Sequence, residues 1–152
     1  MSLRESVEGL HARYAHALDA DRLEEWPGFF TETGVYRIAT AENEERGLPL
    51  PVLYAEGRAM LRDRVASLRH ANIYEPQRYR HLVSCTLIEP EGPIVRSVSN
   101  FLVVRIMQDG EAVLFASGRY LDRVVLAPEP LYAERVVVCD SRRFDTLLAI
   151  PL

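Results

Sequence analysis

Three side chains near the beginning of the chain have the residue types of an iron-binding set. Glu8, His11 and His16 occur at the spacing E-x-x-H-x-x-x-x-H. Mononuclear iron in many oxygenases is held by two histidines and one carboxylate. An iron site here would mean that the chain carries out oxygen chemistry itself, and its absence would point to a supporting role.

The hydrophobic pattern of the same segment argues against a metal site. Apolar residues recur there at steps of three and four, which predicts an amphipathic helix; they are Leu3, Val7, Leu10, Tyr14 and Leu18. Helical positions five apart lie about 140° apart around the axis, so His11 and His16 would not face one metal ion. We therefore expect these two histidines to lie on the solvent-facing side or the rim of the helix.

A second candidate site combines Tyr14, Asp19 and His81, with Asn100 as an additional donor. A histidine that is hydrogen-bonded to a carboxylate can act as a general base, and a tyrosine can act as an acid or an oxyanion donor. These residues would converge if the first helix lay against a strand that contains His81. The alternative is that the same groups are buried and satisfy one another, or lie at an interface.

Helical and turn signals fill the first half of the chain. Ser2 and Glu5 form a capping-box pattern at a helix start, and Pro27-Gly28 ends a short second helix. We expect a turn at Thr33-Gly34, followed by a strand. The remaining elements of this half are a polar loop at 41–51 and an amphipathic helix at 58–69.

Strand signals dominate the second half, with a hairpin turn predicted at Asp109-Gly110. The predicted strands are 81–88, 95–107, 113–126 and 131–138. Helices followed by hairpin-linked strands predict an α+β fold with a mostly antiparallel sheet. A strongly curved sheet wrapped around the N-terminal helices would form a cone with a pocket. The length of 152 residues suits one domain, residues 1–152.

Composition narrows the function classes. The net charge of -4 and the sequence pI of about 5.6 argue against a nucleic-acid binder. No apolar run is long enough for a membrane span, and MSLRESVEGL lacks the apolar core of a secretory signal, so we expect a cytoplasmic protein. Cys85 and Cys139 have no cysteine or histidine at cluster or zinc spacing, and we expect both to be small core residues.

Six segments spread over most of the chain together carry a resemblance to a known family. They are YAHALDADRLEEWPGFFTETGVYRI, NEERGLPLPVLYAEGRAMLRDRVASL, NIYEPQRYRHLVS, VRSVSNFLVVR, FASGRYLDRVV and CDSRRFDTLLAIPL. In this order, from about Tyr14 to Leu152, the chain resembles the small, or beta, subunit of aromatic-ring-hydroxylating oxygenases. The closing segment is the most specific of the six.

The resemblance implies the cystatin-like cone of scytalone dehydratase and ketosteroid isomerase. It implies that the chain binds no iron and no cluster, because the Rieske [2Fe-2S] cluster and the mononuclear iron lie in a large (alpha) subunit. It also implies a homotrimer within a three-large, three-small assembly that receives electrons from a reductase and often a ferredoxin. The family motif contains no catalytic residue to transfer.

Two other functions remain open at this point. One is a stand-alone dehydratase or isomerase that uses Tyr14, Asp19 and His81, and the other is a binding module for a hydrophobic small molecule. The aromatic substrate of an oxygenase complex is not specified by this chain, although the resemblance favours a carboxylated or hydroxylated single ring.

The closing segment is unusually apolar for a free terminus, since unpinned termini are normally polar. We expect it to pack on its own sheet or against a neighbouring copy, and the resemblance favours the second arrangement. Its possible interface residues are Arg142, Arg143, Phe144, Leu147 and Leu148.

Overall fold

Six strands form one strongly curved sheet in the computed structural model, which describes residues 1–47, 51, 53–70, 76–141 and 151–152. The elements in chain order are α1 (Leu3–Asp19), the 3-10 helix η1 (Leu23–Phe29), β1 (Phe30–Thr40), α2 (Ala41–Glu45), β2 (Leu53–Glu56), α3 (Gly57–His70), β3 (Gln77–Glu91), β4 (Ile94–Met107), β5 (Ala112–Val125) and β6 (Leu131–Cys139).

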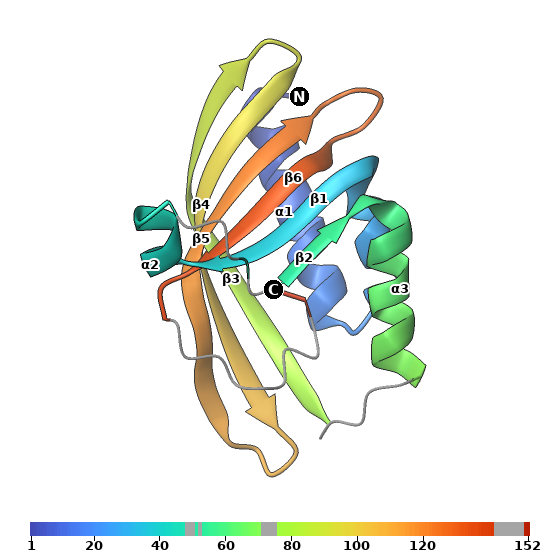
Figure 1. Cartoon of the computed structure of the whole chain (residues 1–152), viewed down its shortest axis with the longest axis vertical. Coiled ribbons are helices and arrows are strands. Elements are labelled where there is room, and N and C mark those ends of the chain that lie inside the picture. Colours follow the sequence, from blue (N-terminus) through green and yellow to red (C-terminus); the bar gives the residue numbers. More distant parts are fainter. Residues whose placement is uncertain (48–50, 52, 71–75, 142–150) are drawn as a thin grey trace.

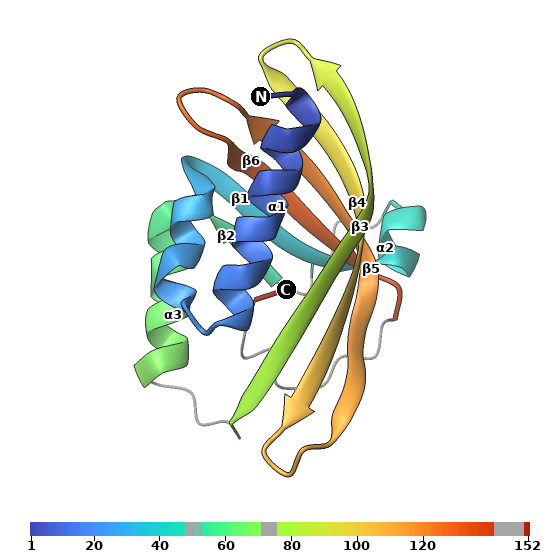
Figure 2. The same ribbon diagram turned by 180° about the vertical axis from the view of Figure 1, so that it is seen from behind.

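The strand order is β2-β1-β6-β5-β4-β3, so the four long C-terminal strands pair in sequence and β1 joins them beside β6. Every neighbouring pair is antiparallel except β1 and β6, which are parallel. The sheet curves around α1, which runs across its concave face, while α2 lies on the other side of the sheet (Figures 1 and 2). The predicted α+β cone with a mostly antiparallel sheet is confirmed.

Helix α1 begins as the sequence predicts. Glu5 donates its main-chain N–H to Ser2 Oγ (3.1 Å), and Ser2 donates its own to Glu5 Oε2 (2.6 Å), which completes the capping box. The five apolar positions of the predicted stripe all turn toward the sheet, and four of them are at most 1% exposed. Helix α3 likewise buries the apolar residues of its inner side, Leu61, Val65 and Leu68.

The predicted turn at Thr33-Gly34 is wrong, because β1 continues from Phe30 to Thr40. The pairing of β1 with β6 instead shifts register between Phe30 and Val35. Gly34 permits this irregularity, since a Cβ at this position would lie 2.9 Å from Phe30 Cβ and 3.0 Å from the Tyr132 carbonyl oxygen. A glycine that packs closely inside a bulged strand is easily mistaken for a turn glycine.

The polar stretch 41–51 is also more structured than the predicted loop. It begins with the short helix α2, whose N-terminus is capped by Thr40 Oγ1 accepting from the Asn43 N–H (3.2 Å). The strand β2 follows it and was not predicted, because four residues give too short a periodic signal.

The predicted hairpin at Asp109-Gly110 is confirmed. Gly110 has φ +91°, and Asp109 Oδ1 accepts a hydrogen bond from the Glu111 N–H (2.9 Å). The β3–β4 hairpin turns at Gly92, with φ +65°, so β3 extends to Glu91, beyond the predicted end of this strand at residue 88.

Aromatic rings fill the interior of the cone. Six of the largest fully buried side chains are Trp26, Tyr14, Tyr36, Tyr79, Tyr120 and Tyr132. Leu152 lies among them and is 0% exposed. Its main-chain oxygen accepts hydrogen bonds from Tyr14 OH (2.7 Å) and Tyr36 OH (3.0 Å), so the chain returns into the core at this residue.

Candidate functional site

A charged cluster lies in the centre of the cone. Arg135 on β6 and Asp122 on β5 are both buried and form a two-pronged ion pair, with Nε–Oδ1 at 2.8 Å and a guanidinium nitrogen–Oδ2 distance of 2.9 Å. The two residues face each other directly across the antiparallel pairing of these strands. An unpaired charge is unfavourable in an apolar interior. In this pair each charged group is neutralised by the other.

Three tyrosine rings enclose the Arg135 guanidinium. Its central carbon lies 3.7 Å from the ring centroid of Tyr120, 4.2 Å from that of Tyr132 and 4.4 Å from that of Tyr14. Burial alone would lower the pKa of Arg135, but Asp122, Tyr132 and Tyr14 hold this pKa well above its ordinary value. Burial raises the pKa of Asp122, against the opposing effect of the Arg135 charge.

His11 belongs to this interior cluster. Its Nδ1 lies 2.6 Å from Tyr132 OH and 3.1 Å from an Arg135 nitrogen, and its Nε2 lies 3.3 Å from the hydroxyls of Ser97 and Ser99. Burial, reinforced by the positive charge of Arg135, lowers the pKa of His11 to about 2, so the imidazole is neutral at ordinary pH. The Arg135 N–H then donates to Nδ1, because a guanidinium has no acceptor.

The three residues of the possible iron set do not come together as ligands. His11 is buried and occupied by the interior cluster, whereas His16 is exposed on the same helix. The Glu8 carboxylate pairs with Arg4 at 2.9 Å. In the described residues no group of three or more histidine, cysteine or acidic side chains could hold a metal ion. The expectation of a rim position is thus correct for His16 and wrong for His11.

The structure does bring Asp19 and His81 together. The Asp19 carboxylate lies 2.6 Å from His81 Nδ1 and also accepts the His81 main-chain N–H, at 3.0 and 3.1 Å. Because a carboxylate accepts, Nδ1 carries the proton. His81 Nε2 is buried and has no hydrogen-bond partner in the described part of the chain. The pair joins the end of α1 to the free edge of β3.

Tyr14 and Asn100 do not join that pair. Tyr14 OH donates to the Leu152 main-chain oxygen and accepts from Trp26 Nε1 (3.1 Å). Asn100 is exposed and alternates along β4 with the buried Ser99 and Phe101, so its side chain lies on the outer face of the sheet. The predicted four-residue site is therefore split into three locations.

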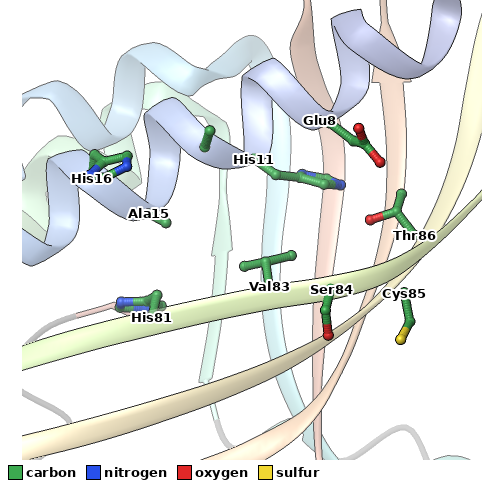
Figure 3. Close-up of a pocket in the computed structure, with 10 residues that line it drawn as sticks. Glu8, His11, Ala15, His16, His81, Val83, Ser84, Cys85 and Thr86 are labelled. Atoms are coloured by element: carbon green, nitrogen blue, oxygen red, sulfur yellow. The ribbon is translucent and has the colours of Figure 1, made fainter.

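A pocket of about 290 Å³ lies between α1 and β3. Figure 3 shows Glu8, His11 and Ala15 of α1 facing the strand, while Ser84 and Cys85 point away from the helix. The lining also includes His16, His81, Val83 and Thr86. Three histidines line the pocket: His11 is held by the interior cluster, His81 has a buried Nε2, and His16 is exposed.

Sequence reasoning missed Asp122 and Arg135, the most deeply buried charged residues. Each lies inside a strand pattern: Asp122 has the buried Tyr120 and Val124 as neighbours at two-residue spacing, and Arg135 precedes a run of three buried valines. Charged residues are very rarely buried unless they are paired. A charged residue at an inward-facing position of a predicted strand was therefore the signal that could have identified Asp122 and Arg135.

The two cysteines differ from each other. Cys139 is buried as predicted, and burial raises its pKa to about 12. The prediction for Cys85 is wrong, because this residue is exposed at an irregularity of β3 with φ +54°. Among the helices that the structure describes, none has the length and apolar character required to cross a bilayer.

The possible interface residues Arg142, Arg143, Phe144, Leu147 and Leu148 lie outside the described residues. Leu152, at the end of the same segment, is buried within its own chain. The prediction that this segment contacts a neighbouring copy therefore stays a prediction for residues 142–148.

Comparisons with known proteins give consistent results at the levels of sequence and fold. A family model described as "SnoaL-like domain" matches residues 1–137. The chain is 42% identical over 148 residues to a terephthalate 1,2-dioxygenase terminal oxygenase component subunit beta 1 from Comamonas sp, covering 96% of each chain. It is 43% identical over 145 residues to the anthranilate 1,2-dioxygenase small subunit from Burkholderia cepacia, covering 94% of this chain and 90% of the relative.

A solved structure from Novosphingobium aromaticivorans has the same fold. It was assigned as the beta subunit of an aromatic-ring-hydroxylating dioxygenase and superimposes with a TM-score of 0.89 at 35% identity. The match covers 97% of this chain and 95% of the other. The similarity therefore extends over nearly the whole length of all three relatives.

Proposed function

The chain belongs to the small, or beta, subunits of aromatic-ring-hydroxylating dioxygenases, and from this membership we propose that it supports a large catalytic subunit without supplying catalytic residues. The observation that carries the proposal is the identity of about two residues in five to small subunits of two dioxygenases, over at least nine-tenths of each chain.

The filled interior of the cone favours a structural, non-catalytic role for this chain. Space that a substrate would need is taken by the Arg135–Asp122 pair, the surrounding tyrosine rings and Leu152. Arg135 pairs with Asp122, and Tyr14 donates to Leu152, whereas Tyr120 OH and Arg135 Nη1 have no hydrogen-bond partner in the described part of the chain. The paired groups of such a buried polar network rigidify a fold. We propose that residues 1–152 act as one domain, because a core that extends from Val7 to Leu152 lies against one sheet.

The stand-alone dehydratase or isomerase is the weaker candidate. Its specific observation is the 2.6 Å contact of Asp19 with His81 beside a pocket. A general base needs access to the proton that it removes. His81 Nε2 is buried, and Tyr14 and Asn100 lie elsewhere, so the pair serves better as a link between α1 and β3.

The partner in this proposal is a large (alpha) subunit that carries the Rieske [2Fe-2S] cluster and the mononuclear iron. We propose a cytoplasmic assembly of three large and three small chains, which receives electrons from a reductase, often through a ferredoxin. The two relatives are subunits of a terephthalate 1,2-dioxygenase and an anthranilate 1,2-dioxygenase. We propose a substrate of the same kind, a single aromatic ring that bears a carboxylate, with its pocket in the large subunit.

Reconstitution tests the proposal. The chain is co-expressed with the large subunit from its own genome, and also with large subunits of the terephthalate and anthranilate enzymes. We expect a stable complex whose oxygen consumption requires an aromatic carboxylate and an electron source, and no turnover of the isolated chain. Failure of the chain to bind any of these large subunits would overturn the assignment.

Deletion of residues 144–152 then tests the predicted role of the closing segment. We expect the truncated chain to lose assembly, and mass is measured by light scattering. Because Leu152 is buried in its own core, the replacement Leu152→Ala serves as a control for lost stability. A truncated chain that still assembles and supports turnover would show that this segment makes no assembly contact.

A further inference from the structure

Leu152 is held in the aromatic core in the way that a small ligand would be held. It is 0% exposed, and Pro151 before it is buried as well. Its main-chain oxygen accepts from Tyr14 OH at 2.7 Å and from Tyr36 OH at 3.0 Å, and its main-chain N–H donates to Tyr36 OH at 3.0 Å. Both views place this end of the described chain beside α1 (Figures 1 and 2). Side-chain hydroxyls of distant residues thus bind main-chain groups that secondary structure normally satisfies.

Groups other than Leu152 fix the two hydroxyls. Trp26 Nε1–H donates to Tyr14 OH at 3.1 Å, so Tyr14 keeps its own proton for an acceptor oxygen. The Tyr14 ring lies 4.4 Å from the central carbon of the Arg135 guanidinium. The Tyr36 ring stands edge-on to Trp26, at 5.0 Å between centroids. None of these contacts involves Leu152, so the hydroxyls form a pre-organised site for whatever occupies this position.

The electrostatics of the site favour a neutral occupant. Burial raises the pKa of Tyr14 and of Tyr36 above the ordinary value, so both hydroxyls stay protonated and can donate. The positive charge of Arg135 nearby is neutralised by Asp122, at 2.8 Å between Nε and Oδ1. An anion would therefore lose its hydration without meeting an unpaired positive charge, which is unfavourable.

The groups that Leu152 presents define the chemistry that the site accepts. They are one carbonyl oxygen, one N–H beside it and one apolar side chain. A carboxamide on a small ring offers the same three groups: its oxygen can accept from Tyr14 and Tyr36, and its N–H can donate to Tyr36 OH. Cavities left by a missing apolar core side chain are known to bind small aromatic molecules.

We propose that the position of Leu152 is a binding site for a small neutral molecule that joins a carboxamide to an apolar or aromatic group, and that Leu152 fills this site as an internal ligand. The inference goes beyond the proposed function and does not depend on it, because the aromatic carboxylates proposed as substrates carry a charge that the site disfavours. A tethered occupant competes at an effective concentration of about millimolar. An added ligand therefore binds the wild-type chain weakly, and removal of Leu152 makes the site available.

Deletion of residues 151–152 empties the site, and three probes then compare its preferences by isothermal titration calorimetry. Benzamide carries the carboxamide and the ring, toluene carries the ring alone, and benzoate carries the ring with a negative charge. We expect benzamide to bind the shortened chain at least about 10-fold more tightly than the wild-type chain. We also expect it to bind the shortened chain at least about 10-fold more tightly than benzoate does.

Tyr14→Phe and Tyr36→Phe in the shortened chain test the two hydroxyls. Each replacement removes a hydroxyl and keeps the ring, so we expect the affinity for benzamide to fall about 3- to 10-fold and the affinity for toluene not to fall. Tyr54→Phe is the matched control, because Tyr54 is 47% exposed and its hydroxyl contacts Glu56. This control keeps the affinity for benzamide.

Leu152→Ala in the full-length chain separates the apolar part of the site from the polar part. The main chain of residue 152 still occupies the two hydroxyls in this variant, and only the space of the leucine side chain is freed. We expect toluene to bind this variant, and benzamide to bind it no better than it binds the wild-type chain.

Circular dichroism and thermal melting show whether the shortened chain is folded. A shortened chain that is unfolded alone and folds on addition of benzamide supports the inference, because a ligand stabilises the state that it binds. A shortened chain that stays unfolded at the solubility limit of benzamide contradicts it. The inference is also overturned if benzamide binds the shortened and wild-type chains equally, if neither Tyr14→Phe nor Tyr36→Phe weakens its binding, or if benzoate binds more tightly than benzamide.

Discussion

Asp19 holds His81 through both the side chain and the main chain of the histidine. The carboxylate lies 2.6 Å from Nδ1 and accepts the main-chain N–H at 3.0 Å. His81 lies on β3, which is an edge strand of the described sheet, so the carboxylate satisfies a main-chain group that another strand could otherwise bind. Asp19 and His81 are residue types that can form a catalytic acid–base pair, but in this fold they connect the end of α1 to an edge of the sheet.

Breaking this connection is expected to affect stability and not turnover. Asp19→Ala and His81→Ala each remove a partner from a partly buried hydrogen-bonded pair, which costs about 1–3 kcal/mol of unfolding free energy. The double variant is expected to cost less than the sum of the two, because both changes break the same interaction. Urea denaturation measures the loss, and oxygen uptake per assembled complex with the large subunit measures turnover.

His16→Ala is the control for these variants, since His16 borders the same pocket but is exposed. A His81→Ala variant that melts and assembles normally yet loses all turnover would contradict the structural role of His81 and favour a catalytic one.

His11 makes the stability of the chain sensitive to mild acid. Its pKa is lowered by burial to about 2 in the folded chain, whereas the unfolded chain takes up a proton near the ordinary value of 6.5. The unfolded state then binds more protons, so the unfolding free energy falls as pH decreases below 6.5. The expected slope approaches about 1.4 kcal/mol per pH unit.

Urea denaturation between pH 6.5 and pH 5 measures this slope. Most carboxylates stay ionised at about pH 5 and above, so their titration contributes little in this window. The variant His11→Gln is expected to reduce the slope, and His16→Gln on the same helix is expected to keep it. Equal slopes for the wild type and His11→Gln would show that His11 does not remain neutral in the fold.

Removal of the Arg135 charge is expected to be among the most damaging single changes. Arg135→Met leaves Asp122 buried without a partner, and loss of one member of a buried pair costs about 3–5 kcal/mol. The pKa of Asp122, already raised by burial, would rise further. The folded variant then binds a proton that the unfolded chain releases at neutral pH, so its deficit shrinks as pH falls toward the carboxyl range.

The double variant Arg135→Met with Asp122→Leu separates charge from packing. It contains no unpaired charge, so we expect it to recover much of the stability that the single variant loses. Denaturation curves at pH 7 and pH 5 give both comparisons. A single variant that unfolds like the wild type at pH 7 would contradict the proposed importance of the pair.

The purified chain is expected to be colourless and free of stoichiometric iron. Both ring nitrogens of His11 lie within contact distance of tyrosine, arginine or serine groups, and Glu8 is paired with Arg4. Elemental analysis is the measurement. A content of about one iron per chain that is lost in His11→Ala or His16→Ala would show that these residues form a metal site after all.

Local patterns predicted the elements that depend on local physics. The apolar period of α1, its capping box and the Asp109-Gly110 hairpin are properties of adjacent residues, and all three are confirmed. Gly34 was misread because its role depends on Tyr132, a residue of the neighbouring strand.

The interior site depends almost wholly on long-range pairing. His11 contacts Arg135 across 124 positions of the sequence and Tyr132 across 121. The sequence predicted that Asp19 and His81 could meet, on the expectation that the first helix lies against the strand that contains His81. Nothing local shows that Tyr14 would turn away from them toward Leu152.

Trp26 gives the protein a built-in optical reporter. It is the one tryptophan of the chain, it is 0% exposed, and its Nε1–H donates to Tyr14 OH. Its ring also stands edge-on to Tyr36, at 5.0 Å between centroids, beside the hydroxyl that binds Leu152. Intrinsic fluorescence therefore follows the packing of the aromatic core at a single point. Changes on the outer face of the sheet should leave the emission unaltered, whereas release of Leu152 from the core should change it.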